Sequence, residues 1–211
     1  MKSTIAAIVT AVAFVLTSVQ AAEACSRNVS AKAARTVVPA QNIDQALLSQ
    51  AIRTEVNFHR CRAGLQSVKS ASGELRKQAT RHSGWMAKFQ QLTHRSTVAG
   101  SATLKQRFQN AGISYRAGSE NIGMVHRYQI DNRRFNIVDS RACKFAASDG
   151  TPLPAHSYAS LARHIVNLWM ESPGHRKNIL DRKVTRMTSG VAFDPKAKYC
   201  GRFWVTQNFV G

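Results

Sequence analysis

The sequence predicts an α+β fold, and three observations carry this prediction. Apolar residues recur at helical spacing in several segments, most clearly between Leu75 and Phe89. Short runs at 119–125, 190–193 and 203–209 have the composition of strands. The last two runs are close enough along the chain to pair as a hairpin, which favours an antiparallel sheet covered by helices.

The N-terminus has the features of a secretory signal peptide, to which we assign residues 1–24. Lys2 supplies a positive charge, residues 5–19 form an apolar run, and Ala22-Glu23-Ala24 provides the small residues that a signal peptidase reads. A membrane anchor is an alternative, although the run is short for a span. A lipid-modified Cys25 is a second alternative, but the residues before it make a poor lipobox.

Residues 41–211 are expected to form one domain, because 211 residues with 44% hydrophobic content suffice for a single core of ordinary size. Residues 25–40 are polar and alanine-rich, and we interpret them as an N-terminal arm. Three helices are then expected. They extend from about Gln41 to Gly64, from the N-cap Ser72 through Phe89, and from about Ser101 to Gly112.

The C-terminal half begins with the strand at 119–125 and continues into residues 129–155, which we interpret as an insertion. A fourth helix is expected from about Ser157 to Met170. Pro173 cannot continue that helix and instead begins a short one that ends at Leu180. The two strands at 190–193 and 203–209 complete the chain.

The four cysteines in the exported part predict two disulfide bonds, because their number is even and an exported chain meets an oxidising compartment. Sequence alone allows three pairings. We favour Cys143–Cys200, since both residues lie beside turn-like segments of the C-terminal half, which leaves Cys25–Cys61. No Cys-x-x-Cys spacing occurs, which disfavours a metal cluster.

The charge of +19 predicts attraction to anionic surfaces such as lipopolysaccharide, phospholipid headgroups or acidic polysaccharide. Export makes nucleic acid a poor candidate partner. No apolar stretch after the signal is long enough to cross a membrane, so we expect a secreted or periplasmic protein rather than an integral membrane protein. The alternative is a solvated basic surface without a dedicated partner.

Three residues are candidates for a shared site. His175 is expected at the start of the short helix, where the helix dipole favours a neutral imidazole. Glu120 begins a strand and His94 follows the second helix, so two imidazoles and a carboxylate would suit a divalent ion such as zinc. His82 is interpreted as a core histidine with a satisfied hydrogen bond. The motifs of the commonest enzyme classes are absent from the sequence.

Five motifs, in the same order along the chain, resemble those of the CAP superfamily, whose domain is also called SCP. They are Asn57-Phe58-His59-Arg60, the pattern from Leu75 through His82-Ser83 to His94, Ser119-Glu120-Asn121-Ile122, Trp169 through Leu180, and Thr206-Gln207-Asn208-Phe209. The fourth contains Ser-Pro-Gly-His-Arg, as in bacterial members. Asn57, Arg60, Asn121 and Trp169 are the structural residues that these motifs imply.

The resemblance implies a three-layer α-β-α sandwich around a central antiparallel sheet. Animal members carry a cleft with two histidines and two glutamates that sometimes holds zinc. His94 and Glu120 match the first of each. Ser172 stands at the position of the second glutamate, with Glu171 one residue earlier. The second histidine is missing, and we expect His175 to replace it.

These observations favour an exported CAP-domain protein, non-enzymatic or weakly catalytic, that binds a lipid or another anionic ligand of the cell envelope, with zinc as the candidate metal for this binding. One alternative is a metal-assisted hydrolase of peptide or cell-wall substrates, in which His94 and His175 hold zinc and Glu120 is a ligand or general base. A structural or interaction protein with a vestigial cleft is the other.

Overall fold

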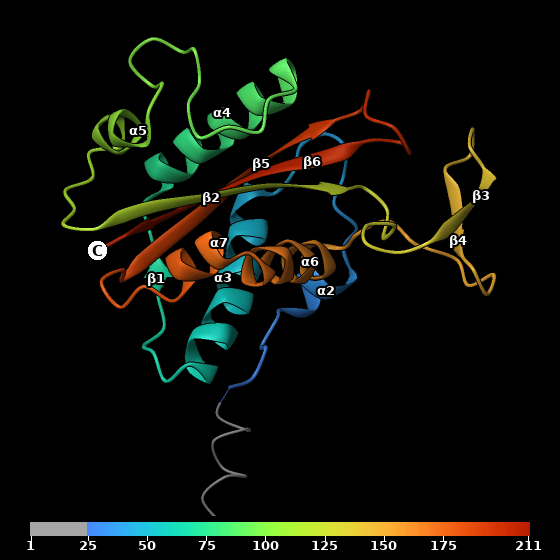
Figure 1. Ribbon diagram of the computed structural model, residues 1–211, viewed down its shortest axis with the longest axis horizontal. Helices are drawn as coiled ribbons and strands as arrows, with labels where there is room; N and C mark the ends of the chain where they lie inside the picture. Colours follow the sequence, from blue (N-terminus) through green and yellow to red (C-terminus); the bar gives the residue numbers. More distant parts are fainter. Residues whose placement is uncertain (1–24) are drawn as a thin grey trace, which may run out of the picture.

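The structure, a computed structural model, describes residues 25–211, so the predicted signal peptide lies outside the described residues. A sheet with the strand order β1-β5-β6-β2 lies between two layers of helices (Figure 1). The strands are β1 (Lys69–Ser70), β2 (Gly118–His126), β5 (Arg186–Asp194) and β6 (Arg202–Val210). One layer contains α4 (Gly73–Phe89) and α5 (Leu104–Asn110). The other contains α2 (Ala31–Arg35), α3 (Gln45–Arg62), α6 (Tyr158–Glu171) and α7 (Pro173–Ile179). The predicted α+β sandwich is therefore confirmed.

The sheet is antiparallel except at one edge. The central strand β6 pairs antiparallel with both β5 and β2. The two-residue strand β1 pairs parallel with β5, with Lys69 opposite Arg186 and Ser70 opposite Met187. The expected central antiparallel sheet is thus found in β5, β6 and β2, and β1 adds one parallel pair at its edge. Two residues are too few to show an alternating pattern, so the sequence contains no signal for this strand.

Helix α4 covers one face of the sheet at a very short distance. Its N-terminus is capped by Ser72, whose side chain accepts a hydrogen bond from the Leu75 amide. The middle of the helix lies on Gly190 of β5, where an added Cβ would overlap the backbone of Thr80. The Ser83 hydroxyl lies within hydrogen-bond distance of both the Gly190 carbonyl, at 3.1 Å, and Thr206 Oγ1, at 2.9 Å. The strand must therefore present a glycine at this crossing.

The opposite face of the sheet carries the main core. Trp169 of α6 is buried, and its indole Nε1 donates to the Ile122 carbonyl of β2 at 3.0 Å. Gly123 makes room for this ring, since a Cβ there would lie 2.7 Å from Ile165 Cδ1 and 3.1 Å from the indole nitrogen. Other large buried side chains on this face are Tyr158, Leu161, Phe203 and Phe209.

Two motif residues on α3 make structural hydrogen bonds. The Asn57 side chain donates to the Val68 carbonyl and accepts from the Val68 amide. The Arg60 guanidinium is buried and donates to four backbone carbonyls, those of Gln66, Ile179, Asp181 and Val184. Together these side chains connect α3 to the turn that follows it and to the turn after α7.

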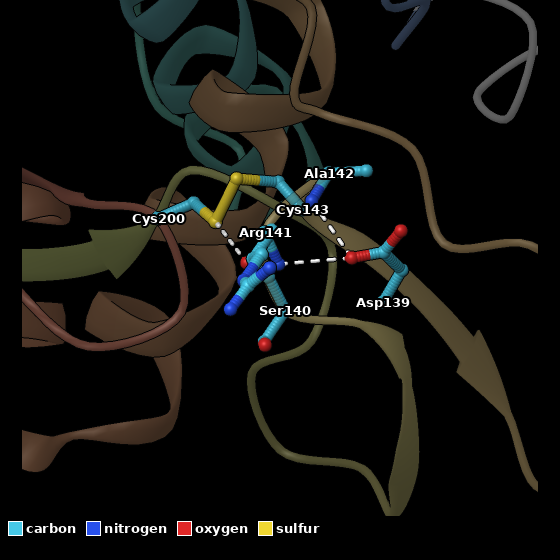
Figure 2. Close-up of a disulfide and its surroundings, with 6 residues drawn as sticks. All are labelled: Asp139, Ser140, Arg141, Ala142, Cys143 and Cys200. Carbon is cyan, nitrogen blue, oxygen red and sulfur yellow. Dashed lines mark hydrogen bonds between the residues drawn. A yellow bond between two sulfur atoms is a disulfide. The ribbon is translucent and has the colours of Figure 1, made fainter.

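Residues 128–155 contain a second, two-stranded sheet of β3 (Phe135–Asp139) and β4 (Lys144–Ala147), which stands away from the main body (Figure 1). Its small core consists of Ile130, Phe145 and Leu153. The Cys143–Cys200 disulfide joins it to the loop between β5 and β6 (Figure 2). In the turn before Cys143, Asp139 accepts hydrogen bonds from two successive backbone amides.

The second disulfide, Cys25–Cys61, attaches residues 25–40 to α3, so the favoured cysteine pairing is the one in the structure. Ala33 and Val38 of this segment are buried in the main core, and Val37 forms a β-bridge with Ser157. None of the helices within residues 25–211 combines the length and the apolarity that a bilayer crossing requires.

Two glycine-to-alanine substitutions of identical chemistry should have opposite effects on stability. Gly190→Ala should lower the free energy of unfolding by about 2 kcal/mol or more, because the methyl group overlaps α4. Gly84→Ala, on α4 itself, meets no atom within 4 Å and should raise it by roughly 0.5–1 kcal/mol. Urea denaturation measures both values. A neutral Gly190→Ala would contradict the close helix–sheet contact.

Candidate functional site

Glu120, at the start of β2, is the centre of the candidate site. Its side chain faces α5, and the Arg107 Nη2 atom lies 2.8 Å from Oε1 and 2.7 Å from Oε2. Both side chains are only 2% exposed. Arg107 also donates to the carbonyls of Ser101, Ala102 and His94. The carboxylate is thus neutralised by a guanidinium that also holds the surrounding loop in place.

His94 completes the outer side of this pair. Its Nδ1 atom donates to Glu120 Oε1 at 3.0 Å, while its side chain is 57% exposed. The structure therefore brings together two of the three residues that the sequence nominates. His94 is the accessible one, and Glu120 lies behind it.

His82 of α4 lies on the inner side of the pair, 3.9 Å from Glu120 Oε1. Its Nε2 atom donates to the Thr93 carbonyl at 3.0 Å, which leaves Nδ1 as an acceptor. Burial lowers the pKa of His82 from 6.5 to about 4, so the imidazole is neutral at pH 7. The sequence analysis placed His82 in the core, with one satisfied hydrogen bond, but did not connect it with Glu120.

His175 lies near this group but makes no contact with the carboxylate in the described residues. Helix α7 is bound to β2 by Asn121, which donates to the His175 carbonyl at 3.3 Å, and by Asn178 near the end of the helix, which donates to the Glu120 carbonyl at 3.2 Å. Burial, followed by the charge of His94, lowers the pKa of the His175 imidazole. Within residues 25–211, no hydrogen bond or ion pair joins this imidazole to His94 or Glu120.

Two hollows adjoin the Arg107–Glu120 pair. The outer one has a volume of about 280 Å³ and is lined by His94, Arg95, Thr103, Leu104 and Glu120. The inner one is smaller, about 130 Å³, and is lined in part by Gln78, His82 and Arg107. Gln78 Oε1, His82 Nδ1 and Arg107 Nε are buried without a hydrogen-bond partner in the protein. The inner hollow therefore offers two acceptors and one donor to a small polar group.

The donor set does not fit zinc. Among residues 25–211, no three His, Cys, Asp or Glu side chains are arranged to hold a metal ion. Both oxygens of Glu120 already face the positive charge of Arg107, and a divalent cation would be repelled by the same guanidinium. The predicted zinc ligands His94, Glu120 and His175 therefore do not form a metal centre.

Arg107 is the residue that sequence reasoning missed, although a signal was present. It lies three residues after Leu104 and directly before Phe108, on the apolar side of a helix that starts with a Thr103–Gln106 capping box. An arginine on a buried helix face requires an anionic partner.

The comparisons with known proteins identify the fold and the family. A family model described as the cysteine-rich secretory protein family, CAP, matches residues 54–209. An outer surface protein from Borrelia burgdorferi is 14% identical with a TM-score of 0.51, over 82% of this chain and 98% of that one. An extracellular protein containing an SCP domain from Bacillus anthracis is 22% identical with a TM-score of 0.49, over 79% of this chain. This chain covers 41% of that protein's length. No curated protein sequence matches.

Removal of the Glu120 charge should destabilise the protein strongly. Glu120→Gln leaves the buried Arg107 guanidinium uncompensated, so the free energy of unfolding should fall by about 3–5 kcal/mol. Glu74→Gln removes the same charge from an exposed pair with Lys77 and should leave the stability unchanged. Denaturant unfolding of both variants provides the comparison, and equal stabilities would refute the role assigned to Arg107.

The depressed pKa of His82 should make stability depend on pH. Its folded value of about 4 lies below the unfolded value of 6.5, so the unfolded state binds the proton first as the pH falls. The stabilisation is complete above pH 6.5 and is lost between 6.5 and 4, at up to about 1.4 kcal/mol per pH unit. His82→Gln should reduce this slope, measured by denaturation at several pH values, and His94→Gln serves as the exposed control. An unchanged slope in His82→Gln would exclude a buried neutral imidazole.

Proposed function

The chain belongs to the cysteine-rich secretory protein family, CAP, and from that premise we propose that it is an exported binding module for an anionic ligand of the cell envelope. The observation that carries the proposal is that most of the positively charged side chains have no acidic partner within the described residues. Only five of the Lys and Arg side chains in residues 25–211 form an ion pair. They are Arg27, Lys32, Lys77, Arg107 and Arg163. Of the remaining Lys and Arg residues in the described part of the chain, only Arg60 is buried, so the others are available to an external anion.

The acidic side chains do little to neutralise this surface, because several are used inside the protein. Glu55 is fully buried between Arg27 and Arg163. Glu120 is buried against Arg107, and Asp131 is bonded to His126. The excess positive charge behind the net charge of +19 therefore lies at the surface. There it raises the local concentration of anionic ligands.

Export is supported by the two disulfides, which persist in oxidising compartments such as the periplasm and the extracellular space. The predicted signal peptide points the same way. We therefore propose a secreted or periplasmic location, where phospholipid headgroups, lipopolysaccharide and acidic polysaccharides are the available anions.

In this proposal the cleft around Glu120 is a preorganised binding surface rather than a metal centre. Arg107 holds Glu120, and Glu120 orients His94 toward solvent through the 3.0 Å hydrogen bond. The donor set that a metal-assisted hydrolase needs is missing from this arrangement. The alternative is a vestigial cleft that binds no ligand, and the vesicle-binding experiment described below distinguishes it from a binding surface.

The mature protein should bind vesicles that contain phosphatidylglycerol, and should not bind vesicles of phosphatidylcholine alone. We expect saturable binding in a sedimentation assay that persists at roughly 1 M NaCl, where the Debye length is about 3 Å. Specific contacts at short range survive this screening, whereas attraction by net charge does not.

Two results would contradict the proposal. Binding that disappears with salt would show that charge alone is responsible, and absence of binding would favour the vestigial cleft. Metal analysis of the same preparation tests the alternative. Stoichiometric zinc that is lost in His94→Ala would support the alternative function, a metal-assisted hydrolase.

A further inference from the structure

A further hollow, separate from the two beside Glu120, is lined by residues of the turn after α3, of β1 and of the turn after α7. Its volume is about 600 Å³, and it is lined by residues 60, 64–67, 69, 182 and 184–186. Four of these residues are cationic, namely Arg60, Lys69, Arg182 and Arg186, and none is acidic. By contrast, the hollow of about 420 Å³ beside α6 contains Asp131 together with Arg133 and Arg163.

Arg60 supplies a buried positive charge to this hollow. Its hydrogen bonds also hold in place the two turns that line the hollow. The residue is 2% exposed, and its Nε and Nη1 atoms donate to the carbonyls of Gln66, Ile179 and Asp181 at 2.8–2.9 Å. Nη2 makes a single long hydrogen bond of 3.5 Å to the Val184 carbonyl, which leaves this nitrogen with donor capacity. Burial lowers the pKa of Arg60, as expected for a poorly solvated cation.

Two further cations are held side by side by the sheet. Lys69 and Arg186 are register partners in the parallel β1–β5 pair, and both line the hollow. Like charges directly opposite each other on neighbouring strands are destabilising. No ion pair compensates either of them in the described residues. An anion between them would relieve this repulsion.

The Asp181 carboxylate, whose charge acts on Arg60, does not fill that role. Asp181 raises the pKa of Arg60 through its charge, but it does not line the hollow. Its Oδ1 atom accepts a hydrogen bond from the Lys183 amide in the same turn. The cations around the hollow thus face a space without an internal counterion.

We propose that this hollow binds the phosphate group of an anionic ligand. The inference rests on the proposed function and assigns it a second site and a ligand class. A single arginine is enough for a carboxylate, whereas a phosphate presents more oxygens and more charge, which suits the guanidinium forks of Arg182 and Arg186 with Lys69 as a point charge. A volume of about 600 Å³ leaves room for a group attached to the phosphate.

The experiment compares two double variants with the same loss of charge. Arg182→Gln/Arg186→Gln removes two rim cations and spares Arg60, whose carbonyl hydrogen bonds the fold needs. Arg141→Gln/Lys144→Gln removes two exposed cations from the β3–β4 hairpin and is the matched control. Each protein is titrated with inorganic phosphate in a calorimeter and sedimented with vesicles containing phosphatidylglycerol at high salt.

We expect the affinity of the Arg182→Gln/Arg186→Gln variant to fall at least tenfold for the probe that the unaltered protein binds, and that of the control to change less than twofold. Binding of phosphate identifies a soluble phosphate ligand, and binding of vesicles alone identifies a lipid headgroup. Equal losses in both variants, or no binding of either probe by the unaltered protein, would overturn the site. If vesicle binding persists equally in all three proteins, the proposed function stands and the site assignment is wrong.

Discussion

The edge of the sheet formed by β2 is the constraint on which much of the structure depends. An edge strand leaves alternate backbone carbonyls unpaired, and these must find donors. Asn178 of α7 donates to the Glu120 carbonyl, and the Trp169 indole donates to the Ile122 carbonyl. Asn121 links the same strand to α7 and to Gln207 of β6. The motifs that identify the family are therefore the residues that close this edge.

The same strand connects the fold to the candidate site. Successive residues of β2 point to opposite faces, so Asn121 binds α7 while Glu120 binds Arg107 of α5. The loop before α5 is held by the same Arg107, and this loop carries His94. The position of the exposed imidazole thus follows from a buried ion pair, which in turn follows from the position of one strand.

The sequence predicts the long elements well, because helical periodicity over several turns is a strong signal, as α4 and α6 show. It misses α2, β1 and β4, which are short, and it begins β5 four residues late. Thr188 and Ser189 at that point are polar but buried, with Ser49 as their hydrogen-bond partner, and such long-range pairing leaves no trace in local composition. The proximity of His94 and Glu120 follows from the family motifs. The pairing of Arg107 with Glu120, and the absence of a contact between His175 and Glu120 in the described residues, depend on tertiary packing.

The two disulfides join consecutive cysteines, so their loops neither overlap nor enclose one another. A chain that crosses a membrane from its N-terminus presents Cys25 and Cys61 before either of the other two has emerged. Each cysteine therefore encounters its native disulfide partner first. Oxidation in the order in which the cysteines emerge yields the native pairing. Under the proposed export, formation of the two disulfides would require an oxidant but no rearrangement of mispaired bonds by an isomerase.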